Sequence, residues 1–189
     1  NRLPDRARVV IIGGGIIGSS VAYHLTKLGW TDVVLLERKE LTGGTTWHAA
    51  GLLPQLRNSR VLSELSKYAI ELYPKLEAET GQPTGFKQPG GIYVARTQGR
   101  MEEYKRMIST GRSFGVEVEE IGLREAKAKW PLLQTEDLVG AMHVPKDGVT
   151  VPGDTAMALA KGAMNAGASV FENTKVTAIK RLDGMAVGV

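Results

Sequence analysis

One strand, turn and helix segment near the start of the chain limits the possible folds more than any other feature. Residues 8–12 form a short apolar run rich in β-branched side chains, which is typical of a parallel strand buried on both faces. The run passes directly into Gly13-Gly14-Gly15-Ile16-Ile17-Gly18, where Gly13, Gly15 and Gly18 have the G-x-G-x-x-G spacing. The segment therefore predicts the first half of a βαβ unit with a very tight turn.

Each of the three glycines has a separate task in such a turn. Gly13 permits the sharp reversal, Gly15 lets the backbone approach a pyrophosphate, and Gly18 lets the helix pack closely on the strand. We predict a helix from Ile16 to about Leu28, with Gly29 as its stop and with its N-terminal N–H groups aimed at phosphates. Its apolar stripe is expected to contain Val21, Ala22, Leu25 and Leu28.

A second predicted strand, residues 33–36, ends at an acidic residue in the expected place. Glu37 follows Gly18 by 19 positions. This is near the spacing of about 20 expected of a carboxylate that binds the two hydroxyls of a ribose. A ribose with a free 2′-hydroxyl is favoured, because a 2′-phosphate would be repelled by Glu37. Glycines alone are compatible with a βαβ unit that binds no nucleotide, but the complete order of strand, glycines, helix, strand and Glu37 favours a dinucleotide.

The segment after Glu37 separates two classes of dinucleotide enzyme. A nicotinamide enzyme would continue into alternating helices and strands, whereas residues 38–52 here are dense in small and hydroxyl side chains. Gly43 and Gly44 permit close backbone approach, and Thr45 and Thr46 can donate hydrogen bonds to phosphate oxygens. Since Trp47 and the apolar residues that follow it suit a solvated loop poorly, a flavin is favoured over a nicotinamide.

This segment resembles a known flavin-binding signature. Glu37-Arg38 followed by residues 43–51 is similar to the signature of the glycine oxidase and D-amino-acid oxidase superfamily. Its core, Thr46-Trp47-His48-Ala49-Ala50-Gly51, is most similar to the dimethylglycine and sarcosine dehydrogenase branch. The similarity continues through residues 79–91, 130–133 and 147–152, so it covers almost the whole chain.

The resemblance implies a set of FAD contacts and a special role for His48. His48 matches the histidine that, in the dehydrogenases of the family, is bonded covalently to the 8α-methyl group of the flavin. A contact without a bond, or a space-filling role, are the alternatives. The chain has no cysteine, so a cysteinyl anchor cannot come from this segment. The implied contacts are Gly13, Gly15, Ile16, Ile17, Gly18, Glu37, Arg38, Gly44, Thr45, Thr46, Trp47, His48, Ala49, Ala50, Gly51, Leu52 and Val176.

The resemblance also implies a fold and an activity. The fold is α/β, a Rossmann-like FAD-binding fold of the glutathione-reductase type, with the start of an inserted α+β substrate domain. The activity is oxidative demethylation of dimethylglycine or sarcosine by hydride transfer to flavin N5, which leaves an iminium for hydrolysis or for tetrahydrofolate bound to a further C-terminal domain. The electron acceptor would be oxygen or an electron-transfer flavoprotein, in a bacterial cytoplasm or the mitochondrial matrix.

Other functional interpretations of the sequence remain open. The same branch includes a catalytically silent phosphatase regulatory subunit, and other amine or amino-acid oxidases share the fold. No catalytic residue can be assigned from the sequence. His24 and His143 are interpreted as structural, while Tyr93 and Arg57 are conceivable substrate contacts.

Composition excludes some classes of partner. With 42% apolar and 23% charged residues, the chain has an ordinary globular composition, and the apolar stretch from Val9 to Ala22 is too interrupted by glycines and serines for a membrane span. The net charge of +4 is mild, and basic residues alternate with acidic ones between Arg100 and Arg106. This pattern indicates a solvated helix face rather than a nucleic-acid surface.

The order of predicted elements indicates an interrupted nucleotide-binding domain. We expect residues 1–85 to be its first part, residues 86–145 to start the substrate domain, and residues 146–189 to return to the FAD-binding domain within a longer protein. A helix is predicted over 59–80, kinked or restarted at Pro74, with Val61, Leu65, Tyr68, Leu72 and Leu76 at three-to-four spacing. Strands are predicted over 90–96, 116–120, 138–144, 169–172 and 176–179, helices over 101–114, 123–129 and 152–165, and a hairpin turn at Asp183-Gly184.

Overall fold

The computed structural model describes residues 2–189 and divides the chain into two compact units. The first unit contains the residues up to Gly51 together with Tyr73–Gly85 and Val151–Val189. The second unit contains Leu52–Leu72 and Phe86–Thr150. The division falls inside helix α2 (Arg60–Thr80), one residue before Pro74, and the helix runs through this proline without a break.

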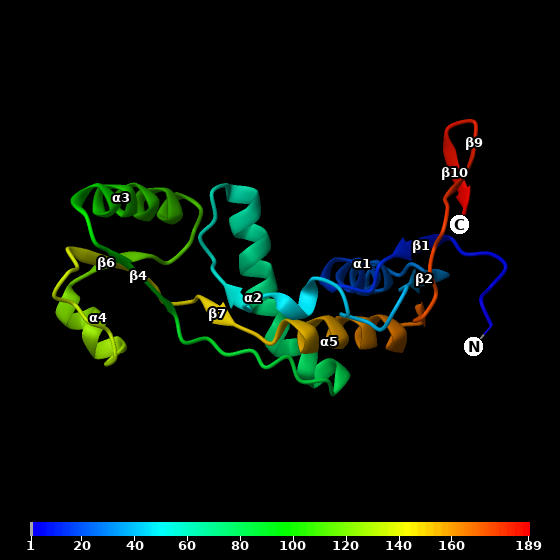
Figure 1. The fold of residues 1–189 in the computed structure, drawn as a ribbon, viewed down its shortest axis with the longest axis horizontal. Helices are drawn as coiled ribbons and strands as arrows, with labels where there is room; N and C mark the ends of the chain where they lie inside the picture. The colour runs from blue at the N-terminus through cyan, green and yellow to red at the C-terminus, as the bar shows by residue number, and fades with distance from the viewer. Residues whose placement is uncertain (1) are drawn as a thin grey trace. The chain divides into compact units, whose positions relative to one another are not determined.

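The first unit contains a three-stranded parallel sheet, of which β1 and β2 are labelled in Figure 1. Its order is β1 (Val9–Ile12), β2 (Val33–Leu36) and β8 (Ser169–Phe171). All four residues of β2 are buried, as expected of an apolar strand with neighbours on both sides. The predicted strands here are confirmed, and β1 and β2 pair in register from Val9 opposite Val33 to Ile12 opposite Leu36.

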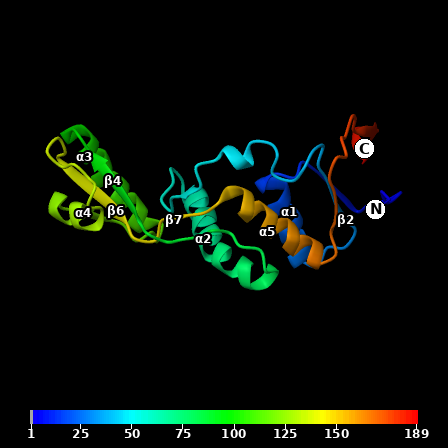
Figure 2. The same cartoon turned by 60° about the horizontal axis from the view of Figure 1, so that its bottom comes forward.

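Helices α1 (Ile16–Lys27) and α5 (Pro152–Asn165) lie side by side in the first unit (Figure 2). The buried face of α1 consists of small and polar residues and one tyrosine rather than the predicted apolar stripe. Val21 is 43% exposed and Leu28 is 77% exposed, so that part of the prediction is wrong. Tyr23 instead packs closely on α5, since a Cβ added at Gly162 of α5 would lie 2.7 Å from Tyr23 Cδ2. The buried residues of α1 are Ser19, Ala22, Tyr23 and Thr26.

The last residues of the chain form an antiparallel hairpin of β9 (Lys180–Leu182) and β10 (Met185–Gly188). Asp183 and Gly184 both have positive φ, as a two-residue hairpin turn of this kind requires, so the predicted turn is confirmed. The strand predicted over 176–179 is wrong, because ladder pairing begins only at Lys180.

The second unit is built on an antiparallel sheet with a helix on each face (Figure 1). Its order is β4 (Gly91–Ala95), β6 (Gly140–Val144) and β5 (Glu119–Ile121). Adjacent side chains of β6 point to opposite faces of the sheet. Met142 packs in one hydrophobic cluster with Ile108 of α3 (Gln98–Ser113). Ala141 packs in a second cluster with Ala126 of α4 (Leu123–Lys129). A short pair, β3 (Leu52–Leu53) with β7 (Gly148–Val149), was not predicted.

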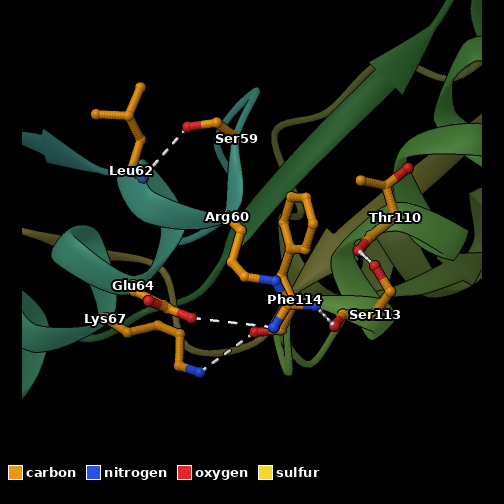
Figure 3. A network of polar contacts seen from close by, with 8 residues as sticks. All are labelled: Ser59, Arg60, Leu62, Glu64, Lys67, Thr110, Ser113 and Phe114. Carbon is orange, nitrogen blue, oxygen red and sulfur yellow. Dashed lines mark hydrogen bonds and ion pairs between the residues drawn. The ribbon is translucent and has the colours of Figure 1, made fainter.

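Two basic residues of α2 cap the C-terminal end of α3 (Figure 3). Arg60 Nη2 donates to the carbonyl oxygen of Ser113 at 2.8 Å, and its guanidinium lies 5.2 Å from the ring centre of Phe114. Lys67 Nζ donates to the carbonyl oxygen of Phe114 at 3.4 Å. Cations at this end satisfy carbonyl groups left unpaired by the helix and interact favourably with its dipole.

Most of the apolar stripe of α2 is exposed. Leu76 is fully buried, but Val61 is 73% exposed, Leu65 is 62% exposed and Tyr68 is 47% exposed. Periodicity identified an amphipathic helix correctly, but most of its apolar stripe is not covered within the described part of the chain. The predicted strand at 116–120 also lies later, at Glu119–Ile121, while α4 and α5 match their predicted bounds.

A carboxylate near the end of α2 joins this helix to α1 within the first unit. Glu79 accepts a hydrogen bond from Tyr23 Oη at 2.9 Å and pairs with Lys27 Nζ at 2.6 Å. The Lys27 ammonium, together with the Tyr23 hydroxyl, holds the pKa of Glu79 below its ordinary value of 4.5, against the effect of partial burial.

Glu79→Gln is expected to destabilise the protein in a pH-dependent way. Because the folded-state pKa of Glu79 is lowered, the ionised carboxylate stabilises the fold above the unfolded pKa, and this contribution disappears as the pH falls through the folded pKa. We expect a loss of up to about 1 kcal/mol in the free energy of unfolding at pH 7. Urea titrations at pH 7 and pH 3, with the exposed Glu77→Gln as control, measure it. An equal loss at both pH values would contradict the prediction.

Candidate functional site

The glycine turn has the geometry that its sequence predicts. Gly13 has φ of +106°, a conformation that a residue with a side chain rarely adopts, and its N–H donates to the carbonyl oxygen of Leu36 at 2.8 Å. A Cβ at Gly18 would overlap the carbonyl oxygen of Gly13. The turn and the first helix are thus in direct backbone contact, and only glycine at position 18 leaves room for this contact.

Glu37 is held at the turn by backbone donors. The N–H of Gly14 donates to Glu37 Oε2 at 2.7 Å, and the N–H of Lys39 donates to Oε1 at 2.9 Å. Burial pushes the pKa of Glu37 upward, but the two N–H donors and the neighbouring Arg38 charge outweigh it, so the pKa lies below its ordinary value of 4.5. Glu37 is therefore a fixed, ionised acceptor at neutral pH, and its remaining lone pairs suit hydroxyl donors.

Thr46 ties the following loop to the start of α1. Its Oγ1 accepts the N–H of Ile16, the first residue of α1, at 2.9 Å, and the side chain is buried. A Cβ at Gly15 would lie 2.9 Å from the same Oγ1. The N-cap residue Gly15 provides no side-chain cap, and the first turn of α1 has no acidic side chain. The next amides of this turn therefore have no acceptor within the helix and suit an anion.

These groups line one cleft of about 560 Å³ in the first unit. It contains most of the predicted contacts from the glycine turn and from the loop after Glu37. Ile11, Ile12 and Val21 also line it, and the sequence reasoning missed them. The signal was available, because Ile12 directly precedes the turn and Val21 lies one helical turn beyond Gly18. The predicted residues that line the cleft are Gly13, Gly15, Ile16, Ile17, Gly18, Glu37, Gly44, Thr45, Thr46 and Ala49.

His48 lies just beyond this lining, in a short 3₁₀ turn (Thr46–His48). Its Nδ1 is 3.2 Å from the carbonyl oxygen of Gly44, and its ring centre is 3.8 Å from that of Trp47. Both side chains are exposed. The Gly44 carbonyl thus holds one ring nitrogen of His48 and Trp47 covers one face of the ring, while the imidazole stays accessible to another molecule.

The other predicted contacts do not line the cleft. Arg38 and Ala50 are exposed, Gly51 is buried at the end of the loop, and Leu52 begins β3 in the second unit. Val176 is half-buried in the extended segment between β8 and β9. Their roles as cofactor contacts stay predictions.

The remaining candidate side chains are engaged in contacts within the fold. His24 Nδ1 lies 2.7 Å from the carbonyl oxygen of Ser20. His143 is 7% exposed, and its Nδ1 lies 3.1 Å from Glu119 Oε1. Both partners fit the structural interpretation of these histidines.

Tyr93 is also engaged, in the second unit. Its hydroxyl donates to Asp147 Oδ2 at 2.6 Å, and burial together with this carboxylate raises the pKa of Tyr93. The Tyr93 hydroxyl therefore uses its proton in the hydrogen bond to Asp147. Arg57 is exposed and lies close enough for its charge to act on Tyr93. Within residues 2–189, no group of three or more His, Asp or Glu side chains is arranged to hold a metal ion.

Comparison with known protein families decides the class of this cleft. The model of the family described as FAD dependent oxidoreductase (DAO) matches residues 8–189. The chain belongs to this FAD-dependent oxidoreductase family. The resemblance found in residues 37–51 is thereby confirmed, and so is the Rossmann-like FAD-binding fold.

Curated relatives of this FAD-dependent oxidoreductase include enzymes and one regulatory protein. The chain is 47% identical over 179 residues to human mitochondrial sarcosine dehydrogenase, covering 94% of this chain and 20% of the relative. It is 44% identical over 181 residues to human mitochondrial dimethylglycine dehydrogenase, covering 95% and 21%. It is 43% identical over 187 residues to the mouse mitochondrial pyruvate dehydrogenase phosphatase regulatory subunit, covering 99% and 21%. The chain thus spans about a fifth of the length of these relatives.

A solved structure supports the fold over nearly the whole chain. The L-proline dehydrogenase from P. horikoshii superposes with a TM-score of 0.89 at 30% sequence identity, covering 96% of this chain and 48% of that one. The architecture of an FAD-dependent oxidoreductase therefore accounts for both units of the chain.

The cleft fits the adenosine diphosphate part of FAD. Gly15 leaves its backbone bare beside Thr46, the first turn of α1 offers N–H groups without acidic neighbours, and Glu37 offers an ionised acceptor. These are the groups that a pyrophosphate and a ribose require. The first turn of α1 would hold the pyrophosphate, and Glu37 would hold the ribose hydroxyls.

Gly15→Val is expected to abolish retention of FAD, because a branched side chain would fill the space beside Thr46 Oγ1 where the backbone must meet the pyrophosphate. Flavin absorbance per mole of purified full-length protein measures the effect. Gly99→Val is the control, since Gly99 is exposed and nothing lies within 4 Å of a Cβ placed there. A normal flavin content in the Gly15 variant would show that the phosphate site lies elsewhere.

Proposed function

We propose that the protein oxidatively demethylates an N-methylated glycine, either sarcosine or dimethylglycine. The observation that carries the proposal is the loop from Gly44 to Gly51, which places His48 accessibly beside the cleft and which favours a flavin over a nicotinamide. Identities of 47% to a sarcosine dehydrogenase and 44% to a dimethylglycine dehydrogenase support this choice of substrate.

The residues of this chain bind and orient, and the reactive group comes from the cofactor. FAD, when bound, supplies the acceptor for the hydride that leaves the N-methyl carbon of the amine. The substrate is left as an iminium, which either is hydrolysed to formaldehyde or passes its carbon to tetrahydrofolate. Glu37 and the start of α1 would hold the adenosine diphosphate end. The Gly44–Gly51 segment would lie along the rest of the cofactor.

Further parts of the proposal concern partners and compartment. The reduced cofactor would deliver its electrons to oxygen or to an electron-transfer flavoprotein, and tetrahydrofolate would bind a further domain. Mitochondrial relatives support the mitochondrial matrix, and bacterial relatives support a bacterial cytoplasm as the alternative. No helix within residues 2–189 is long and apolar enough to cross a membrane.

A second candidate function is a regulatory subunit without turnover. The observation that favours it is 43% identity, over 99% of this chain, to the regulatory subunit of a mouse phosphatase. The same cleft would then bind a flavin for structural reasons.

An absorption spectrum of the full-length protein tests the enzyme against the regulator. We expect bound flavin whose absorbance near its visible maximum is bleached by sarcosine or dimethylglycine under anaerobic conditions, with glycine as the control. Flavin that no N-methylated amine bleaches would support the regulatory subunit, and a protein without flavin would contradict both functions.

We also propose that His48 bonds covalently to FAD. The imidazole is exposed and held by Gly44 and Trp47, and a neutral imidazole nitrogen is a suitable nucleophile. Acid-precipitated full-length protein is expected to stay yellow, and a His48 peptide should carry the mass of the flavin. His48→Ala should release the flavin on precipitation, whereas His24→Gln should retain it. A colourless precipitate from active wild-type protein would show that His48 is at most a non-covalent neighbour.

A further inference from the structure

One residue of the loop between Glu37 and Thr46 has an unfavourable backbone conformation. Thr42 has φ of +65°, in the left-handed region that β-branched residues rarely adopt. Asn173 also has positive φ, at +52°, but asparagine tolerates this conformation well. A threonine keeps it only where its surroundings hold it, and such positions gather at functional sites.

Two hydrogen bonds hold the backbone at this strained position and directly before it. The N–H of Thr42 donates to the carbonyl oxygen of Gly14 at 3.0 Å. The preceding N–H, that of Leu41, donates to Oε1 of Glu172 at 2.6 Å, a short bond to a charged acceptor. Glu172 directly follows β8 and lies 131 positions away from Leu41 in the sequence. A carboxylate that is distant in the sequence is therefore one of the groups that hold this loop.

The Leu41 side chain packs against the glycine turn, at Gly14. Leu41 is 8% exposed, and a Cβ added at Gly14 would lie 2.5 Å from Leu41 Cδ2. Gly14 in turn donates its N–H to Glu37 and accepts the N–H of Thr42. A shift of Leu41 would therefore disturb Gly14, whose N–H holds Glu37 in the cleft lining.

The end of β8 reinforces the same arrangement with backbone bonds. Glu37 donates its N–H to Phe171, and the N–H groups of Asn173 and Thr174 donate to Lys39 and Glu37 at 2.8 Å each. These bonds fix the first residues of the loop. Glu172 adds a side-chain acceptor from outside the loop, at Leu41, directly before the left-handed Thr42.

We propose that Glu172 is a positioning residue for cofactor binding: its carboxylate holds the Leu41 amide, keeps Thr42 left-handed and so keeps Glu37 and Thr46 at the glycine turn. The proposal rests on the assignment of this cleft to FAD. Glu172 is not among the residues that line the cleft, so it would act through Leu41 and Thr42. A residue that accepts positive φ without strain at position 42 should therefore make Glu172 dispensable.

Four variants of the full-length protein test this, all in a His48→Ala background so that binding is reversible. Glu172→Ala removes the acceptor, and Glu172→Gln keeps a neutral one. Thr42→Gly removes the strain, and the double variant Glu172→Ala, Thr42→Gly combines both changes. The dissociation constant for FAD is measured by quenching of flavin fluorescence. Hydrogen exchange of the Leu41 amide is measured in the cofactor-free protein, and urea unfolding of each variant shows whether it is folded.

Glu172→Ala is expected to weaken FAD binding about tenfold, as the loss of a charge-assisted hydrogen bond suggests, and to remove protection of the Leu41 amide. Glu172→Gln should keep the protection and bind within about threefold of the parent. Thr42→Gly alone should bind like the parent, because glycine adopts positive φ freely. The double variant should regain most of the affinity lost in Glu172→Ala.

Two results would overturn the proposal. Unchanged affinity and protection in Glu172→Ala would show that the bond positions nothing. A double variant as weak as Glu172→Ala would show that Glu172 acts on the cofactor directly or through general stability. If the parent protein bound no FAD, the proposed function would fall. Leu41 protection would then still show whether Glu172 holds the loop.

Discussion

The hydrogen bond from the Gly14 amide to the Glu37 carboxylate, 2.7 Å long, is the constraint on which the rest of the site depends. It closes the βαβ unit by joining the turn after β1 to the end of β2. Because Gly13 and Gly18 have no side chains, the first turn of α1 packs directly on the turn after β1. The amides of this helical turn that have no acceptor within the helix line the cleft. The carboxylate stays ionised because backbone donors stabilise its charge. A single bond therefore positions both a ribose acceptor and a phosphate site.

The loop after Glu37 is the second part of the same construction. It leaves β2, reverses at Thr42 and returns to the start of α1 through Thr46. Short loops with glycines and hydroxyls often bind phosphates, but this one is also tied to β8 by Glu172 and by backbone bonds. The cleft and its supports are thus built from three segments that are distant in the sequence: the glycine turn, the loop after Glu37 and the end of β8. Binding at such a site depends on the register of the whole parallel sheet, since a shift of β8 would move Glu172 away from Leu41.

Much of the fold was predictable from local signals. Helix α5 begins at Pro152 and α4 ends shortly before Pro131, and both match the prediction because proline determines where a helix can start or stop. The buried faces of α1 and α2 were less predictable. Val21 is exposed because it lines the open cleft, and Leu28 is exposed at the end of the helix, while Ser19 and Tyr23 are buried. Tyr23 fits there because its contact on α5 is Gly162. Periodicity shows that a helix has an apolar stripe, but it does not show which neighbour covers that stripe.

The sequence by itself determined the class of the protein, because a glycine turn, a strand-terminal Glu37 and the loop around His48 are local patterns that only a dinucleotide cradle explains together. The tertiary structure alone decided how the cradle is held. The bond between Glu172 and Leu41 depends on pairing of β2 with β8 across more than a hundred residues. The left-handed Thr42 and the bond from the Ile16 amide to Thr46 are likewise features that no local pattern predicts. Local sequence encodes backbone preferences, whereas contacts between distant segments exist only once the sheet has formed.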